Sequence, residues 1–376
     1  MAEAGARGGL AGVIAAQTAL SWIDGERGML VYRGYAIDDL ATNASFEEVL
    51  HLLLEGSLPT KVQLDEVKGR LGKYAALPNY VVQVLRGLSK IAAPMEALRT
   101  GVSLLGAGLA TPAAIDLEEA KERAYAIIAQ VPAVIGVFQR GRRGEDPVEP
   151  DPSRSIAYNL LLGLTGKEPN EAFERAMDVA LVLHAEHTLN ASTFAARLTA
   201  STLSDIYSAI TSAIGTLRGP LHGGANEQVA NMLEEIPSVQ VVQDYIDSKL
   251  QARERIMGFG HRVYRTEDPR AKHLREWAQR IADASGQTEI VEKALRVQKV
   301  VLERKGLYVN VDFFSAPLYT SMGIPRDLFT PIFAASRASG WTAHVIEQQA
   351  DNRLIRPSSE YIGDRRAEWV AIEERG

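Results

Sequence analysis

Apolar residues recur at the spacing of an α-helix through most of this chain, and this period limits its fold more than any other feature. In residues 203–220 the apolar side chains fall on one helical stripe, at Ile206, Ala209, Ile210, Ala213, Ile214 and Leu217. A second stripe runs through residues 169–187, at Phe173, Ala176, Val179, Ala180 and Leu183. Such one-sided segments must bury helix against helix, so we expect an all-α fold.

Local signals mark where several of these helices begin and end. Ser45 is followed three residues later by Glu48, the pattern of a capping box, and Gly56 ends the apolar run that follows. Asp116 and Glu119 repeat the same spacing before another long apolar segment. We therefore expect helices to begin after Ser45 and after Asp116.

One stretch near the N-terminus departs from the helical period. Residues 18–35, TALSWIDGERGMLVYRGY, alternate apolar and polar side chains around Asp24-Gly25 and Gly28. This alternation around a turn predicts a β-hairpin. The hairpin would be a minor element of a chain that is otherwise helical.

Glycine and proline cluster at two places that could serve as hinges. One is GPLHGG at residues 219–224 and the other is SMGIP at residues 321–325. A chain of 376 residues with 46% hydrophobic content is long enough for two domains. We expect a large helical domain of residues 1–222 and 324–376, which would carry dimerisation and part of the active site, and a small inserted domain of residues 223–323.

Composition excludes several classes of protein. A formal net charge of −6 argues against a general nucleic-acid binder, which usually needs a basic face. The chain has no cysteine, so it has no disulfide and no thiolate nucleophile, which suits a reducing compartment. Its longest apolar runs are shorter than the roughly 20 residues that span a bilayer. We expect a cytoplasmic protein without a membrane segment.

Positive charge gathers around a histidine in GFGHRVYRTEDPR, residues 258–270. His261 follows a Gly-Phe-Gly turn and precedes Arg262, Arg265 and Arg270. Two interpretations remain open from these residues alone. The segment is either a solvated basic loop with a structural histidine or an anion-binding site built around a proton donor. It is not a dinucleotide-binding fingerprint, because Val263 stands in place of the third glycine.

Three further titratable groups stand out. His222 in GPLHGGANEQ lies between glycines ahead of a predicted helix, where a neutral ring could donate a hydrogen bond; a structural loop histidine is the alternative. His184 and His187 would share the inward face of one helix, as core histidines or as a zinc pair with Glu186, although their spacing is not that of HExxH. We do not expect a metal.

Asp312 is the single acid in the apolar run GLYVNVDFFSAPLY, residues 306–319. The run is expected to bury alternate residues around it. A carboxylate in apolar surroundings resists ionisation and becomes a stronger base. A helix N-cap or a buried, paired acid would explain the same residue.

Several long motifs, in order, make this chain similar to the citrate synthase family. GFGHRVYRTEDPR resembles the signature of that family, GPLHGGANE its first catalytic-histidine loop, and VNVDFFS its catalytic-acid segment. The likeness extends from residue 9 through RASGWTAHVIEQ to IRPSSEYIGDRR and so covers nearly the whole chain. In HAEHTLNASTF, Glu186 and Thr188 stand where relatives commonly have Asp and Glu.

The resemblance implies a two-domain, almost wholly helical homodimer that condenses acetyl-CoA with oxaloacetate and hydrolyses the citryl thioester, an acyltransferase of the tricarboxylic acid cycle. Coenzyme A would be part of a cosubstrate, and neither a permanently bound cofactor nor a metal is implied. Asp312 would take a proton from the acetyl methyl group while His222 hydrogen-bonds the thioester oxygen. His261 would donate to the oxaloacetate carbonyl.

The resemblance also implies a set of binding residues. Those for oxaloacetate are His187, Arg270, Arg337 and, from the partner subunit, Arg356. Those for coenzyme A are Gly258, Phe259, Gly260 and Arg265, with Arg262 and Lys305 as further candidates. Arginine suits a dianion because its planar fork pairs with carboxylates.

Four alternatives remain open. A 2-methylcitrate synthase would use propionyl-CoA, alone or beside acetyl-CoA, through the same residues. A citrate-cleaving lyase module shares the fold, although no ATP-grasp or phosphohistidine domain lies beside it in this chain. An inactive helical dimer could serve as a binding protein, and a metallohydrolase could be built on His184 and His187.

Overall fold

The computed structural model describes residues 9–10, 12–109 and 116–375. Its only sheet within those ranges is antiparallel, with the order β1 (Ser21–Asp24), β2 (Met29–Tyr32), β3 (Tyr35–Ala36). Trp22 pairs with Val31, which confirms the predicted hairpin; the short third strand was not anticipated.

One body of helices includes the long, buried helix α16 (Phe329–Ala350). The others in this body are α1 (Ile37–Asn43), α2 (Phe46–Glu55), α3 (Lys61–Tyr74), α4 (Asn79–Leu88), α5 (Pro94–Ala107), α6 (Leu117–Arg142), α7 (Ile156–Thr165), α8 (Glu171–His184), α9 (Ala191–Ser201) and α10 (Ile206–Leu217). Helix α16 packs against α2, α6, α8, α9 and α10, so it forms the centre of this body. The predicted stripe of residues 206–217 is buried as expected and belongs to α10.

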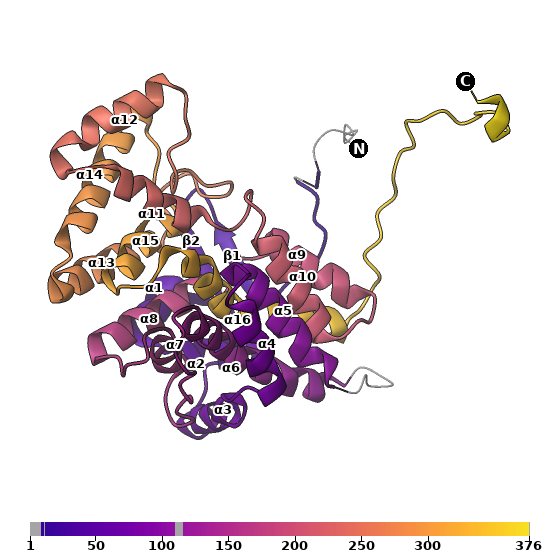
Figure 1. Cartoon of the computed structure of the whole chain (residues 1–376), viewed down its shortest axis with the longest axis horizontal. Coiled ribbons are helices and arrows are strands. Elements are labelled where there is room, and N and C mark those ends of the chain that lie inside the picture. The colour runs from indigo at the N-terminus through magenta and orange to yellow at the C-terminus, as the bar shows by residue number, and fades with distance from the viewer. Residues whose placement is uncertain (1–8, 11, 110–115, 376) are drawn as a thin grey trace.

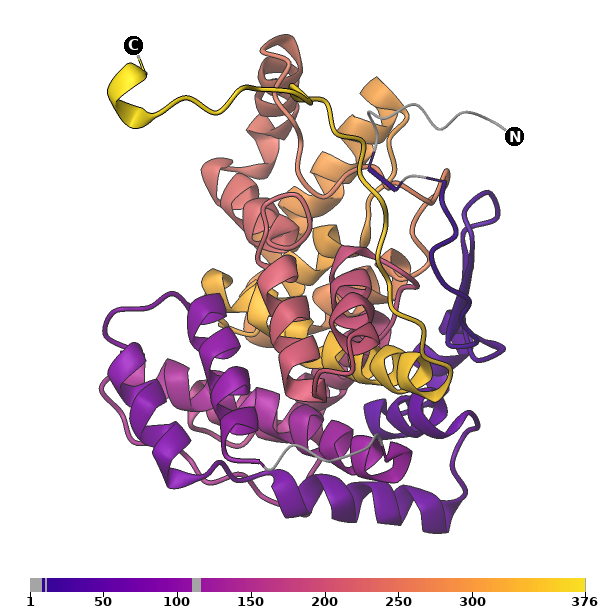
Figure 2. The ribbon, with the colours of Figure 1, turned by 90° about the vertical axis from the view of Figure 1, so that its right-hand side faces the viewer.

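A second group of helices gathers to one side of the first (Figures 1 and 2). It comprises α11 (Ala225–Glu235), α12 (Val242–Gln251), α13 (Ala271–Ser285), α14 (Thr288–Lys305) and α15 (Val311–Ser321), with the short 3₁₀ turn η1 (Val239–Val241). Helix α13 packs against α8, and α11 packs against α16. The 3₁₀ turn η2 (Arg326–Leu328) leads back to α16, and η3 (Ile372–Glu374) lies near the C-terminus.

The capping signals are confirmed at one site and half confirmed at the other. Ser45 and Glu48 form a reciprocal capping box, in which the Ser45 amide donates to Glu48 Oε2 at 2.7 Å. Asp116 caps α6 by accepting from the amides of Glu118 and Glu119. The Glu119 side chain does not complete a box, because it pairs with Arg123 one turn along the helix.

Two local expectations were wrong. The run at residues 306–319 does not alternate, because residues 311–321 form α15; Asn310 caps this helix, and Asp312 lies in its first turn. His187 does not share a helical face with His184, because α8 ends at His184. His187 nevertheless points inward and is 8% exposed. In both places a helix boundary lies inside a segment whose apolar pattern continues across it.

No described helix is long and apolar enough to cross a membrane.

Candidate active site

A cavity of about 480 Å³ lies where the two groups of helices meet. Five chain segments line it: the loop after α8, the loop before α11, the segment 260–270, the start of α15, and α16. It brings together most of the side chains singled out from the sequence, namely His187, His222, His261, Arg262, Arg270, Asp312 and Arg337, together with Gly260. Residues up to 150 positions apart in sequence are therefore neighbours here.

The His222 ring is held as a neutral hydrogen-bond donor. Its Nε2 accepts from the Ser192 amide at 3.2 Å and lies 2.8 Å from Ser192 Oγ. Trp341 Nε1 donates to the same Oγ at 3.1 Å, which holds the hydroxyl in place. Burial, with a contribution from the charge of Arg337, lowers the pKa of His222 to about 4. An accepting Nε2 in a neutral ring leaves the proton on Nδ1, which has no partner among the described residues.

His261 is neutral too, with its proton on the other nitrogen. Its Nδ1 accepts from the amides of Val263 at 2.9 Å and Tyr264 at 3.2 Å. Burial and the charge of Arg270 lower its pKa to about 4. The proton therefore resides on Nε2, which makes no hydrogen bond within the described part of the chain. The tight turn after Gly260 supplies both amides, so the backbone of the loop fixes the tautomer.

His187 completes an aromatic cluster beside His261. The two ring centroids are 5.3 Å apart, and His187 Nε2 lies 3.2 Å from Tyr264 Oη. Burial, with the charges of Arg270 and Arg337, holds the pKa of His187 well below its usual value. All three cavity histidines are therefore uncharged at neutral pH, and each can donate a hydrogen bond without bringing charge of its own.

Asp312 is the cavity's basic group. Burial raises its pKa to about 6, although the charge of Arg270 acts in the opposite direction. Its backbone amide is tied to Asn310 Oδ1 at 3.1 Å, while its carboxylate has no hydrogen-bond partner among the described residues. A carboxylate that is ionised at pH 7 but more basic than usual is suited to proton abstraction.

The two buried arginines of the cavity differ in their surroundings. Arg270 forms a two-pronged ion pair with the buried Asp268, with Nε–Oδ1 and Nη2–Oδ2 distances of 2.9 and 2.7 Å. Sequence reasoning missed Asp268, although an acid two residues before an arginine was a visible signal. Arg337 donates through Nε to the His184 carbonyl at 2.6 Å and stacks on Phe333. Its remaining donors have no partner among the described residues and are available to an anion in the cavity.

The N-terminal hairpin supports two of the cavity loops. Its turn packs so closely on the His261 loop that a Cβ at Gly25 would overlap the Val263 carbonyl, and the Arg265 amide donates to the Gly25 carbonyl at 2.9 Å. Ser21 Oγ accepts from the Thr188 amide at 3.1 Å, next to His187. The hairpin is thus a scaffold for the site, which the sequence pattern did not reveal.

Five predicted site residues do not line this cavity. Gly258 and Phe259 lie at its edge, where the loop pairs with residues 308–310: the Asn310 amide donates to the Gly258 carbonyl, and the Gly260 amide donates to the Tyr308 carbonyl. Arg265 and Lys305 are exposed. Arg356 is exposed in the extended segment after α16, which runs away from the body of helices (Figure 1).

The structure does not support a zinc site at His184 and His187. The described residues contain no group of three or more His, Cys, Asp or Glu side chains that could hold a metal ion. His184 Nδ1 faces the Ala180 carbonyl at 2.7 Å, and its ring packs edge-on against Phe333. Burial lowers its pKa to about 3, so His184 is a neutral core histidine.

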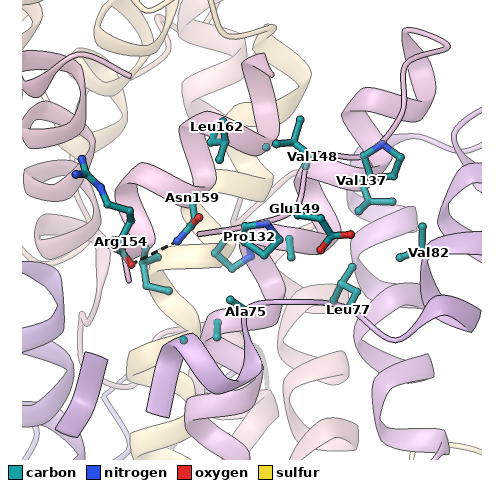
Figure 3. Close-up of a pocket in the computed structure, with 18 of the residues that line it drawn as sticks. Ala75, Leu77, Val82, Pro132, Val137, Val148, Glu149, Arg154, Asn159 and Leu162 are labelled. Carbon is teal, nitrogen blue, oxygen red and sulfur yellow. Dashed lines mark hydrogen bonds between the residues drawn. The ribbon is translucent and has the colours of Figure 1, made fainter. Parts of the chain in front are cut away.

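A second cavity, of about 250 Å³, lies far from this site between α3, α4, α6 and α7 (Figure 3). Its walls are largely aliphatic, with Leu77, Val82 and Val137 around Pro132. Asn159 bonds to backbone groups of residues 151–155. No histidine lines it, and Glu149 is the single carboxylate among its lining residues, so it lacks the combination of a base and two histidine donors found in the first cavity.

Comparisons with known proteins agree with this geometry. Residues 9–358 match the family model "Citrate synthase, C-terminal domain". The chain is 48% identical to citrate synthase 2 of Bacillus subtilis, with 98% of each chain covered, and 42% identical to a 2-methylcitrate synthase of Shewanella oneidensis, with 98% of this chain and 97% of that relative covered. A solved citrate synthase of Thermoplasma acidophilum, in ternary complex with carboxymethyl coenzyme A and oxaloacetate, superposes with a TM-score of 0.91 at 34% identity over 97% of this chain and 98% of that one. This chain therefore belongs to the citrate synthase family.

Proposed function

We propose that this protein is a citrate synthase, which condenses acetyl-CoA with oxaloacetate and hydrolyses the resulting citryl-CoA to citrate and coenzyme A. One observation carries the proposal: a single cavity holds a basic carboxylate, Asp312, and two neutral histidines, His222 and His261, with opposite nitrogens free to donate. Enolisation and attack on a ketone need one base and two such donors.

In the proposed reaction Asp312 accepts a proton, His222 donates a hydrogen bond and His261 supplies a proton. Asp312 removes a proton from the acetyl methyl group, while His222 Nδ1–H stabilises the oxygen of the thioester as the enol forms. The enol carbon then attacks the ketone of oxaloacetate, and His261 Nε2–H supplies a proton to the ketone oxygen as the carbon–carbon bond forms. Water finally cleaves the thioester and releases free thiol. Positioned donors are effective here because a closed site excludes competing water.

Oxaloacetate is a dianion, and we propose that its two carboxylates pair with arginine side chains. Arg337 and Arg270 line the cavity, and Arg356 of a second subunit would complete the set, with His187 as a neutral donor. Removal of one such arginine would leave a buried carboxylate unpaired, at a cost of roughly 3–5 kcal/mol. The availability of the Arg337 donors supports this assignment.

Coenzyme A is proposed to bind at the outer edge of the cavity. Gly258, Phe259, Gly260 and Arg265 are the first candidates, and Arg262 and Lys305 are weaker ones. Three of these side chains, Arg262, Arg265 and Lys305, are exposed and positively charged, which suits the phosphates of the coenzyme. We also propose that residues 223–323 move as a small domain about the segments 219–224 and 321–325, closing over oxaloacetate before the thioester binds.

We propose a homodimer on two grounds. Helices α4, α5, α9 and α10 pack together, and on or next to them Tyr80, Val84, Ile91, Leu198 and Leu203 are exposed, Ile91 by 85%. We propose that these side chains are covered by a partner subunit, because burying exposed apolar side chains favours association. The extended segment that carries Arg356 leaves the body of its own chain, so it is placed to reach a partner.

The alternative is a 2-methylcitrate synthase or an enzyme that accepts both thioesters. It is supported by the 42% identity to such an enzyme, and it would use the same three catalytic residues. The two substrates differ by one methylene group, which a pocket distinguishes by only about 1–3 kcal/mol.

The test is thiol release from acetyl-CoA, measured with and without oxaloacetate and repeated with propionyl-CoA. We expect release from acetyl-CoA only when oxaloacetate is present, with a higher kcat/KM than for propionyl-CoA. Comparable values would move the assignment to a dual or 2-methylcitrate enzyme. No release from either thioester at any concentration would refute the enzyme assignment.

A further inference from the structure

Glu186, the residue before His187, is a buried carboxylate that the proposed reaction leaves without a role. Its side chain is 0% exposed. Oε1 accepts from Ser21 Oγ at 2.9 Å and from His344 Nε2 at 3.0 Å, whereas Oε2 has no hydrogen bond among the described residues. A buried carboxylate with one oxygen unsatisfied is costly, so a nearby positive charge must compensate for it.

Arg337 lies near Glu186 and contributes such a charge. Its guanidinium is anchored by the carbonyl of His184, two residues before Glu186. One helical turn further along α16, Gly340 leaves the space that the Glu186 carboxylate occupies, because a Cβ there would overlap Oε2. Burial lowers the pKa of Arg337 to about 10, and among the charges that act against this, Glu186 is the strongest. Burial raises the pKa of Glu186, but the electrostatic interaction and hydrogen bond with His344, followed by the charge of Arg337 and the hydrogen bond of Ser21, keep it below the usual value.

A network of Arg197 and His344 also holds the Glu186 carboxylate in place. Arg197 Nη1, which can only donate, lies 3.0 Å from His344 Nδ1, so the His344 proton is on Nε2 and faces Glu186. Arg197 is itself held by Gln348 at 3.0 Å and by Glu347. These contacts hold the Glu186 carboxylate in place behind the cavity wall.

Each buried arginine of the cavity therefore has a buried carboxylate near it: Asp268 forms an ion pair with Arg270, and Glu186 lies beside α16 one turn from Arg337. We propose that Glu186 sets the affinity of the site for carboxylate ligands: as the counter-charge of Arg337 it weakens the binding of oxaloacetate and of the more highly charged product, so that the product can leave. This inference rests on the proposed function. A unit charge in a partly screened, buried site changes the affinity for a nearby ion by about tenfold or more.

The first test is Glu186→Gln, which keeps the shape and the accepting Oε1 but removes the charge. We expect oxaloacetate, measured by titration calorimetry, to bind about tenfold more tightly, and citrate to inhibit at about tenfold lower concentration. A residue that only supports the loop would give weaker binding, so the sign of the change separates the two roles. The matched control is Glu347→Gln, which removes a carboxylate from the far end of the same network and should change affinity less than twofold.

An unchanged or weaker affinity in folded Glu186→Gln would overturn the inference, as would equal tightening in the control. If Glu186→Gln does not fold, the double variant with Arg337→Gln tests the pairing, because it removes both charges. It should be clearly more stable than Glu186→Gln alone, and failure to recover stability would refute the pairing. A parent protein that binds oxaloacetate without releasing thiol would refute the proposed reaction alone, and one that does not bind oxaloacetate would refute both proposals.

Discussion

The raised pKa of Asp312 makes the pH dependence of this protein a sharp test of its assigned base. With a pKa of about 6, the carboxylate is ionised in roughly nine tenths of molecules at pH 7 but in roughly one tenth at pH 5. Since only the ionised form can accept a proton, kcat/KM for acetyl-CoA should fall about tenfold between these two values. A carboxylate of ordinary pKa, near 4, would lose almost nothing over the same range.

The histidines cannot produce this fall. His222 and His261 have pKa values of about 4, so both remain neutral from pH 5 upwards. Initial rates of thiol release should be recorded from pH 5 to 8 at constant ionic strength, with far-UV circular dichroism at each pH to show that the protein stays folded. Asp312→Asn should abolish exchange of the methyl protons while leaving oxaloacetate binding nearly intact. A flat profile from pH 5 to 7, or persistent exchange in the variant, would show that Asp312 is not the base.

Three further outcomes are expected. Ser192→Ala removes the hydroxyl that orients His222, so kcat should fall roughly tenfold while the Kd for oxaloacetate stays unchanged; an equal change in both would contradict the role of Ser192. Thr188→Gly should raise the free energy of unfolding by about 0.5–1 kcal/mol, because Thr188 has a φ of 51°, in the left-handed region that glycine adopts more readily than threonine. A lower free energy of unfolding in urea titrations would show that the Thr188 backbone is not strained. Burial and the charge of Glu47 raise the pKa of Asp178 to about 7, above its unfolded value, so the stability that its protonation contributes is lost as pH rises towards 7. Asp178→Asn should therefore gain stability relative to the parent between pH 4 and 7, by up to about 1.4 kcal/mol per pH unit, and a difference in Tm that does not vary with pH would contradict this.

Much of the site could be predicted from the sequence because its residues lie in uninterrupted local motifs. His222 lies between glycines, His261 follows a glycine turn, and Asp312 stands alone in an apolar run. Each pattern is complete within about a dozen residues. The same holds for the Ser45 cap and the hairpin turn, whose geometry depends on nearest neighbours.

The two wrong predictions, at Asp312 and at His187, concern segments whose structure depends on a contact that the apolar pattern does not show. The apolar run around Asp312 reads equally well as a strand or as the start of a helix, and Asn310 at its cap decides for the helix. The stripe of α8 continues past His184, yet the chain leaves the helix there because Tyr32 of the hairpin accepts from the Glu186 amide and donates to the Glu186 carbonyl. No spacing along the sequence encodes a partner 154 residues away.

The sequence by itself determined the helical class, the hairpin and the residues to which we assign the chemistry. Only the tertiary structure decided their states: Ser192 sets the proton of His222, the loop amides set that of His261, and burial sets the basicity of Asp312. The reason is physical. Helical period and capping arise from interactions over a few residues, whereas protonation depends on which groups the fold buries together and on which of them can only donate or only accept a hydrogen bond.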